Sequence, residues 1–429
     1  MQSPAAFVLP RALPGGLVLR PAAGPQDLEA VLAGHLAGFG DEDEASLRAN
    51  LFTRPGGRPE DVLFVEDPTT GRSVSSVSLI HSTWRYEGLS IPVAEVGIVS
   101  TRPEYRGRHL VRELFAAYHH LAARRGYPIS IIAGIVHYYR QYGYEYVVPM
   151  GGGVRLRPDQ IPDLPAGETS PWTVRPARPE EMPALLAFYA EEARSLGLCA
   201  GLSEEIWRYQ DGLPAEARER RATFILEKGG LPAGFLRTWA RPIPEWGAGV
   251  QIQAAHLPHQ DACLAALRWA RDESLRAHEG RTVRVELSHE APLVQAAQAL
   301  GGEVLRPYGW QVRVLDPVAL MMRIAPALEA RLAASPFAGL TDTFSMRLAR
   351  EALVLRFRQG RLQNAALLPR PPRPDVTLPP HVAPMVWFGW RSIQEVWDWY
   401  PDATVHSPAA GRLADVLFPK RPAWVCSLF

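Results

Sequence analysis

Residues 93–144 decide the fold of this chain. They read V-A-E-V-G-I-V-S-T (93–101), R-P-E-Y-R-G-R-H-L (102–110), P-I-S-I-I-A-G-I (128–135) and H-Y-Y-R-Q-Y-G-Y (137–144). We interpret them as a strand, a basic turn, a helix, a second strand and the start of a Tyr-rich helix. Backbone N–H groups and the positive end of a helix dipole converge where Arg106, Gly107 and Arg108 precede the helix. The sequence therefore predicts a pyrophosphate site at this turn.

The helix after the turn is amphipathic, which predicts that it packs on a sheet and holds the turn rigid. Its predicted apolar face consists of Leu110, Val111, Leu114, Phe115, Tyr118 and Leu121. Arg106 and Arg108 could also be two solvated charges, but their position at a strand–turn–helix junction favours phosphate binding. Tyr139 would lie one strand away, at the reacting end of a phosphate-bearing cofactor. The alternative is that Tyr139 is one packed aromatic among several. The arrangement outlines an acyl-CoA-dependent transferase.

The composition is that of an ordinary globular protein. The chain has 429 residues, of which 47% are hydrophobic and 21% charged, and its formal net charge is +1. This charge argues against a nucleic-acid partner held by a broad basic surface. Three widely spaced cysteines predict neither a disulfide framework nor a metal site. With no signal peptide pattern and no 18-residue apolar run, we expect a cytoplasmic protein without a membrane span.

The chain divides into three predicted domains. The first covers residues 1–158 and is followed by a Pro-rich connector; the second covers 172–315 and the third 316–429. W-T-V-R-P-A-R-P (172–179) echoes L-V-L-R-P-A-A-G-P (17–25), which suggests a duplicated fold. The second copy has no basic glycine turn in Q-I-Q-A-A-H-L-P-H-Q-D (251–261), so we expect it to be structural. In the third domain, the Trp-rich stretch 385–400 is predicted to cover a core face, with lipid or partner contact as the alternative.

Two motifs carry a family resemblance. P-E-Y-R-G-R-H-L (103–110) resembles the R/Q-x-x-G-x-G/A motif of GNAT acetyltransferases, and Y-R-Q-Y-G-Y (139–144) resembles their Tyr-x-x-x-Gly-aromatic ending. With the domain order, the chain is similar over nearly its whole length to the enhanced intracellular survival (Eis) acetyltransferases. The resemblance implies an α+β protein: tandem GNAT folds, with mixed β-sheets flanked by helices, followed by a sterol-carrier-protein-like α/β domain.

The resemblance also implies roles for individual residues. Tyr139 becomes the general acid that protonates the departing CoA thiolate, and the carboxylate of Phe429 becomes the general base. Glu95 is the alternative base, because some GNAT enzymes carry a catalytic Glu on this strand. The residues implied to contact the cofactor are Ile98, Val99, Ser100, Arg106, Gly107, Arg108, His109, Leu110, Val111, Gly134 and Ile135.

Two positions depart from the motif: His109 and Val111 stand where it usually has glycines. Val111 is common in Eis-like sequences, whereas His109 is not. A side chain at His109 could crowd the pyrophosphate if the backbone needs a positive φ there. A protonated imidazole could instead add a phosphate contact.

The function predicted from these features is N-acetyl transfer. Acetyl would pass from acetyl-CoA to a primary amine of a small cationic substrate, or to a lysine side chain, by direct attack and without a metal. The alternative is a non-enzymatic acyl-CoA-binding or lipid-binding protein on a degenerate GNAT scaffold. A small-molecule amine is the expected partner, and the resemblance implies a homo-oligomer, a hexamer.

Overall fold

The computed structural model describes residues 7–40, 44–242, 247–279, 281–369 and 373–427. The chain forms two compact units. The first consists of Met1–Glu42, Leu51–Val148 and Gly309–Ala423, and the second of Asp43–Asn50, Pro149–Tyr308 and Trp424–Phe429. The predicted first and third domains thus fall mainly into one unit. The predicted boundaries themselves stay a prediction.

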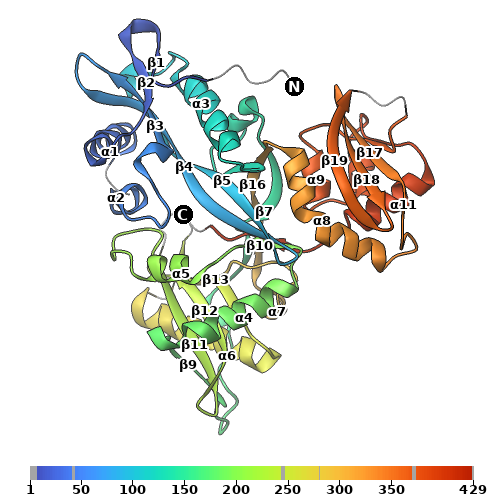
Figure 1. The fold of residues 1–429 in the computed structure, drawn as a ribbon. Coiled ribbons are helices and arrows are strands. Elements are labelled where there is room, and N and C mark those ends of the chain that lie inside the picture. Colours follow the sequence, from blue (N-terminus) through green and yellow to red (C-terminus); the bar gives the residue numbers. More distant parts are fainter. Residues whose placement is uncertain (1–6, 41–43, 243–246, 280, 370–372, 428–429) are drawn as a thin grey trace. The chain divides into compact units, whose positions relative to one another are not determined.

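The first unit is built on a long mixed sheet (Figure 1), in which strands follow the order β1-β2-β3-β4-β5-β6-β16-β7. Its strands are β1 (Arg11–Ala12), β2 (Val18–Pro21), β3 (Val62–Asp67), β4 (Arg72–Tyr86), β5 (Leu89–Thr101), β6 (Ile129–Ile132), β7 (Glu145–Met150) and β16 (Tyr308–Val314). Strands β2 to β5 pair antiparallel, whereas β5 and β6 pair parallel. A parallel pair needs a crossover, which α3 (Leu110–Arg124) supplies.

Strands β4 and β5 are long and buried although β4 is rich in serine. Two of the serine hydroxyls compensate for their burial by hydrogen bonds to the neighbouring strand. Ser75 Oγ donates to the Ser100 carbonyl at 2.8 Å, and Ser76 Oγ donates to the Ile98 carbonyl at 3.0 Å. These bonds fix the register of β4 against the end of β5, where the predicted site begins.

Helix α3 buries the face predicted from its sequence, with Leu114, Phe115 and Tyr118 at 0–1% exposure. Val111 and Leu121 are half-buried instead. Each fully buried large apolar side chain contributes about 1.5–3 kcal/mol, so this face anchors the helix firmly. Helix α1 (Pro25–Phe39) also packs on β4 and β5, burying Leu28, Val31 and Leu32.

A smaller five-stranded sheet of order β19-β18-β17-β20-β21 completes the first unit. The elements of this part are α8 (Pro317–Ala333), β17 (Thr343–Leu348), β18 (Glu351–Arg358), β19 (Arg361–Pro369), β20 (Val376–Thr377), α9 (Ala383–Trp387), α10 (Ile393–Trp399), β21 (Thr404–Val405) and α11 (Pro408–Leu417). In the Trp-rich stretch Trp387 is buried, as predicted, but Trp397 and Trp399 are 50% and 81% exposed. The likeness of this part to sterol carrier proteins stays a prediction.

The turn between β4 and β5 connects the two sheets of the first unit. Tyr86 donates a hydrogen bond to the Trp387 carbonyl at 2.9 Å, and Glu87 forms an ion pair of 3.0 Å with Arg331 of α8. Trp84 meets the ring of Phe388 edge-on at 5.8 Å. The predicted first and third domains are therefore held together by a mixed aromatic and polar contact.

The second unit contains a sheet of order β15-β8-β14-β13-β12-β11-β9. Its elements and the remaining short segments are α2 (Glu44–Phe52), β8 (Gly153–Leu156), β9 (Trp172–Pro176), α4 (Met182–Arg194), β10 (Leu198–Ala200), α5 (Glu204–Asp211), β11 (Arg221–Lys228), β12 (Leu231–Trp239), β13 (Ala248–His256), α6 (Gln260–Ala277), β14 (Thr282–Val285), α7 (Pro292–Ala299), β15 (Glu303–Leu305) and β22 (Ala423–Trp424). Strands β13 and β14 pair parallel and α6 connects them, as α3 connects β5 and β6.

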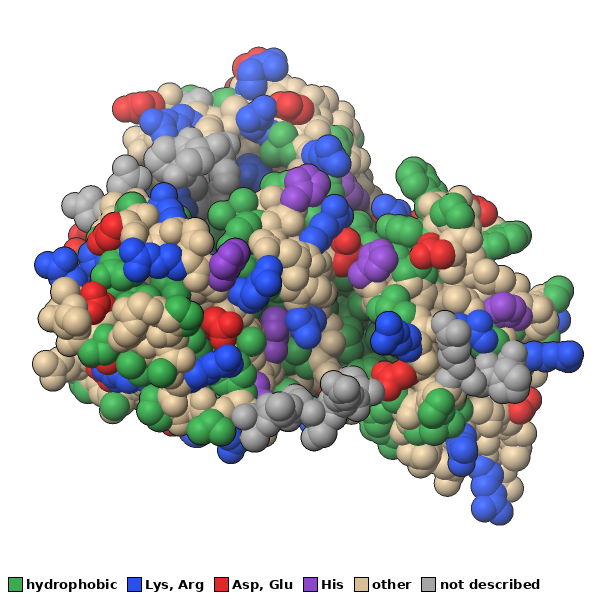
Figure 2. Space-filling model, turned by 90° about the horizontal axis from the view of Figure 1, so that it is seen from above, with side chains coloured by type: hydrophobic (Ala, Val, Ile, Leu, Met, Phe, Trp, Pro, Cys, Tyr) green, Lys and Arg blue, Asp and Glu red, His purple; other side chains and the backbone are tan. Residues whose placement is uncertain are grey.

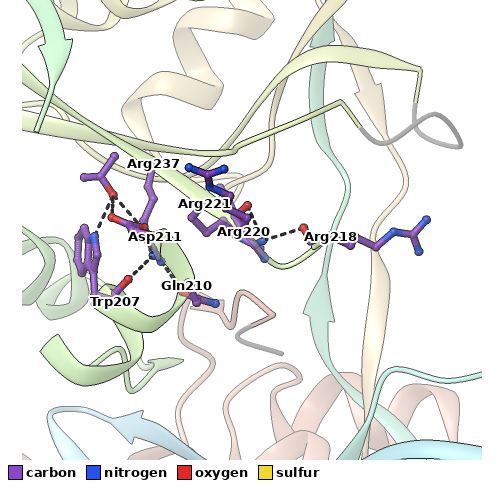
Figure 3. Close-up of polar contacts among 9 residues, drawn as sticks. Trp207, Gln210, Asp211, Arg218, Arg220, Arg221 and Arg237 are labelled. Carbon is purple, nitrogen blue, oxygen red and sulfur yellow. Dashed lines mark hydrogen bonds and ion pairs between the residues drawn. The ribbon is translucent and has the colours of Figure 1, made fainter. Parts of the chain in front are cut away.

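A buried arginine ties helix α5 to this second sheet (Figure 3). Arg237 of β12 donates to Gln210 Oε1 at 2.6 Å and to Asp211 Oδ1 at 2.7 Å. Trp207 donates its indole N–H to Thr223 Oγ1 at 2.9 Å, and Thr223 in turn donates to Asp211. Since a buried cation is costly unless it is paired, Asp211 and Gln210 are what allow Arg237 to be 3% exposed.

The surface carries no single field of charge on the face shown in Figure 2, where basic side chains are interspersed with acidic and apolar ones. This agrees with a net charge of +1. None of the described helices is long and apolar enough to cross a membrane.

Candidate active site

A groove of about 450 Å³ opens in the first unit where β5 ends and α3 begins. It collects most of the residues that the sequence singled out. Its lining residues are Phe39, Val99, Ser100, Thr101, Tyr105, Arg106, Gly107, Arg108, His109, Leu110, Val111, Arg112, Ile135, Tyr138, Tyr139, Gln141 and Tyr142. Of the predicted site residues in the described part of the chain, Ile98 and Gly134 lie beside the groove instead of lining it.

Strand β5 carries a bulge beside the groove. Ser76 pairs with Ser100 but Ser78 pairs with Gly97, so β5 has an extra residue, and Ile98 adopts a φ of +48°. Positive φ is rare for a β-branched residue and marks local strain of the kind that clusters at functional sites. The pairing of β5 with β6 ends at Glu95 and Ile131. Beyond that point the backbone of β5 is not paired with β6 and borders the groove.

The turn before α3 is ordered by contacts of Tyr105. Its hydroxyl donates to Asp67 Oδ2 at 2.7 Å, and the guanidinium of Arg108 lies 4.8 Å from the centre of its ring. Gly107 has a φ of +77°, which glycine adopts without cost. Arg106 and Arg108 are exposed at the N-terminus of α3. The turn thus presents two cations and the N-terminus of α3 to the groove, a combination that suits a phosphate.

His109 is the N-cap residue of α3 and has a left-handed backbone with a φ of +59°. The sequence raised the concern that this position needs a positive φ, and it does. Histidine is among the residues that tolerate this region better than most. Its side chain is exposed and makes no capping hydrogen bond, so the imidazole lies at the rim of the groove.

We expect His109→Gly to raise the free energy of unfolding by about 1 kcal/mol, because glycine avoids the steric cost of a left-handed conformation. Urea denaturation of both proteins measures this change. The same pair of proteins, titrated with CoA, shows whether the imidazole hinders or helps the cofactor. A variant less stable than the parent would contradict the strain at this position.

Tyr139 lies in the short 3-10 helix η4 (Tyr138–Tyr142) and is 5% exposed. Its ring packs 5.7 Å from that of Phe115 on α3. Gly134 makes this position possible, since a Cβ atom there would lie 2.1 Å from Cε2 of Tyr139. Burial, with a smaller effect of Tyr138, raises the pKa of Tyr139 to about 12. The phenol is therefore protonated at neutral pH and available as a hydrogen-bond donor.

The sequence predicted that Gly134 and Ile135 belong to the second strand. They lie outside it, because β6 ends at Ile132. They lie in the loop that leads to η4. The apolar run 129–135 extends past the strand, and Ile135 and the following Val136 are exposed, at 64% and 55%. Gly134 contributes to the site by leaving room for the Tyr139 ring. Ile135 forms part of the groove wall.

Glu95 is 6% exposed and does not line the groove. Burial raises the pKa of its carboxyl to about 8, and the nearby Arg54 opposes this shift. Arg54 is itself buried and donates to the Leu79 carbonyl at 3.1 Å. The other candidate base, Phe429, lies outside the described residues.

Sequence reasoning missed several lining residues. Phe39 is 62% exposed at the end of α1 and lines the groove. Nothing in the sequence indicated this exposure, because Phe39 follows the apolar spacing of its helix but is the last residue of α1. Tyr105, Tyr138 and Tyr142 adjoin the recognised motifs and could have been found as their neighbours.

In the second unit, the connection between β13 and α6 corresponds to the basic turn between β5 and α3 but has a different sequence. Between β13 and α6 the chain has Leu257, Pro258 and His259, and His259 has an extended backbone. The carboxylate of Asp261 lies in the first turn of α6 and accepts from the Trp172 indole at 2.8 Å. A protein carboxylate thus lies at the helix start, where the first unit presents arginines.

A parallel β5–α3–β6 unit, a bulged strand and a basic turn at a helix start together form the groove of this α+β fold. Residues 20–147 match the family described as acetyltransferase (GNAT) domain. No curated protein matches the sequence.

Solved structures share the fold over nearly the whole chain. A GCN5-related N-acetyltransferase from Anabaena variabilis has 13% identity and a TM-score of 0.69, with 95% of this chain and 99% of that one covered. One from Kribbella flavida has 19% identity, a TM-score of 0.66 and coverages of 96% and 100%. Eis1 from Mycobacterium abscessus has 16% identity, a TM-score of 0.59 and coverages of 93% and 96%. At these identities the similarity shows a shared fold.

Proposed function

We propose that this protein is an N-acetyltransferase that transfers acetyl from acetyl-CoA to a primary amine. The observation that supports it most is the groove of the GNAT domain, which has exposed Arg106 and Arg108 at one end and the buried Tyr139 phenol in its wall. The pyrophosphate would bind at the basic turn, and the pantetheine arm would follow the unpaired end of β5. The site residues remain those predicted from the sequence.

The reaction would be a direct attack. The amine nitrogen forms a bond to the thioester carbon, the carbon–sulfur bond breaks, and sulfur leaves with the bonding electrons while a base takes the amine proton. Full proton transfer from a phenol of pKa about 12 to a thiolate of pKa about 8.5 is uphill by about 5 kcal/mol. We therefore refine the role of Tyr139: it donates a hydrogen bond to sulfur as negative charge develops there.

The proposed architecture is a tandem GNAT protein of the Eis type with a sterol-carrier-like third domain, and an oligomer of this chain. The matching order of strands around the parallel pairs β5–β6 and β13–β14 supports the tandem fold. The acidic first turn of α6 supports a structural role for the second copy.

A thiol-release assay tests the function. Acetyl-CoA is incubated with the protein and a panel of polyamines, aminoglycosides and lysine peptides, and free CoA is measured. We expect release that depends on one class of amine. The alternative, a non-enzymatic binder of acyl-CoA or lipid, predicts cofactor binding by calorimetry without release for any acceptor.

The base is proposed to be the Phe429 carboxylate, with Glu95 as the rival. If Glu95 is the base, it must be ionised, and since its pKa is raised to about 8 kcat/KM should fall about tenfold per pH unit below pH 8. Glu95→Gln would then lower the rate and abolish this dependence. Deleting Phe429 tests the other base. An acid limb that persists in Glu95→Gln belongs to the substrate amine and removes Glu95 from the mechanism.

Stability responds to Glu95 in a definite direction. The folded chain keeps a proton up to about pH 8, whereas the unfolded chain loses it above about pH 4.3. The contribution of this group to stability is therefore complete in acid and is lost as the pH rises toward 8.

A further inference from the structure

Buried polar side chains form an unbroken hydrogen-bonded chain behind the groove. His119 Nε2 lies 3.0 Å from Tyr144 Oη, and Tyr144 Oη lies 2.7 Å from Ser130 Oγ. Ser130 Oγ lies 3.1 Å from Tyr118 Oη, which donates to the Ala94 carbonyl at 3.0 Å. Tyr118, Ser130 and Tyr144 are at most 1% exposed. The three hydroxyl groups therefore depend on one another for hydrogen bonds.

The donor and acceptor of every hydrogen bond in this series follow from the bond between Tyr118 and the Ala94 carbonyl. A carbonyl can only accept, so Tyr118 uses its one proton on Ala94 and must accept from Ser130. Ser130 then has to accept from Tyr144, and Tyr144 has to accept from an N–H group on His119 Nε2. Burial lowers the pKa of His119 to about 3, so the ring is neutral and this tautomer is fixed. A chain polarised in one direction is strengthened by cooperativity.

The chain joins β5 to β6 immediately before these strands part. Ala94 and Ser130 face each other in the parallel pair, and only the pair of Glu95 and Ile131 follows. Tyr118 adds helix α3 to the same junction. The chain thus fixes the point where the backbone of β5 becomes free to border the groove.

The other end of the chain supports Tyr139. Tyr144 lies two residues after the end of η4, and its ring meets that of Tyr139 edge-on at 6.4 Å. Phe115 packs against both rings, at 5.7 and 6.1 Å. The family motif asks only for an aromatic ring at the position of Tyr144, so its hydroxyl is a feature of this chain that the motif does not explain.

We propose that Tyr144, Ser130 and Tyr118 are positioning residues, whose hydrogen-bonded chain holds the Tyr139 phenol at the groove and sets the divergence of β5 and β6. The inference rests on the proposed acetyl transfer and adds residues that act through Tyr139. Misplacing a reacting group by about 1 Å can cost up to about a hundredfold in rate.

The experiment is a double-mutant cycle with a matched control. Ser130→Ala removes the central link and Tyr144→Phe removes one hydroxyl, each in the wild type and in Tyr139→Phe. We expect kcat to fall about tenfold in the first background, with KM for acetyl-CoA within about twofold, and no further fall in the second background. The control, Tyr86→Phe, loses a phenol hydroxyl that is equally buried but is not part of this hydrogen-bonded series. It should keep the wild-type kcat.

Equal losses in both backgrounds, or the same loss in Tyr86→Phe, would show a general effect on stability and overturn the proposal. A second readout is independent of turnover. With 3-fluorotyrosine incorporated, the ¹⁹F signal of Tyr139 is identified by its loss in Tyr139→Phe. It should shift or broaden in Ser130→Ala and stay unchanged in Tyr86→Phe. An unmoved signal in Ser130→Ala refutes the positioning role. This readout does not need turnover, so it tests the positioning role even if the wild type acetylates no acceptor and the proposed function is wrong.

Discussion

Tyr139→Phe is expected to lower kcat by about a hundredfold or more while KM for acetyl-CoA changes less than about twofold. The ring stays, so its packing against Phe115 and above Gly134 is retained. What is lost is the hydrogen bond to sulfur, which matters chiefly in the transition state, and removal of one such donor costs about 10²–10³ in kcat. Steady-state kinetics with the amine identified by thiol release measures both constants.

Tyr86→Phe again serves as the control, because it removes a buried phenol hydroxyl away from the groove. Calorimetry with CoA should give the same affinity for Tyr139→Phe and wild type. A Tyr139→Phe enzyme with full kcat would exclude this phenol from the chemistry, while leaving the cofactor site untouched.

Reversing the two charges of the turn should abolish cofactor binding at micromolar concentrations. In Arg106→Glu/Arg108→Glu, two charge-assisted contacts to phosphate are replaced by repulsion. Each such contact is worth about 1.5–3 kcal/mol, so the Kd for CoA should rise at least about a hundredfold. Titration calorimetry at low salt gives the Kd, and the wild-type affinity should weaken as salt is added.

The matched control reverses two arginines elsewhere in the first unit. Arg124 and Arg323 are both exposed, one in the last turn of α3 and the other on α8. Arg124→Glu/Arg323→Glu changes the net charge equally and should bind CoA within about threefold of wild type. If both double variants bind alike, the basic turn is not the pyrophosphate site.

Local sequence was sufficient to predict much of the architecture. The apolar spacing of 110–121 predicted α3, which extends over Leu110–Arg124. The basic turn was recognisable because Arg106 and Gly107 stand between a strand and an amphipathic helix. These signals are local: they depend on side-chain period and turn chemistry within a few residues.

Other features needed contacts between distant residues. The exposure of Phe39 depends on where α1 ends relative to β5. The strand predicted at 128–135 ends at Ile132, and Ile135 lines the groove instead. The pKa of Glu95 depends on burial by neighbours far away in sequence. No periodicity reveals that these four residues meet, since Tyr118 and His119 come from α3, Ser130 comes from β6, and Tyr144 is the residue before β7.

The sequence by itself determined the class of the first domain: a strand, a basic glycine turn and a helix, with a phenol one strand further on. Tertiary structure decided what these residues can do. It placed the bulge at Ile98 beside the turn, fitted Tyr139 over the bare Cα of Gly134, and linked buried hydroxyls into one chain. The reason is physical. Helix and strand periods are written along the chain, whereas burial, pKa shifts and hydrogen-bond direction arise only when separate segments pack together.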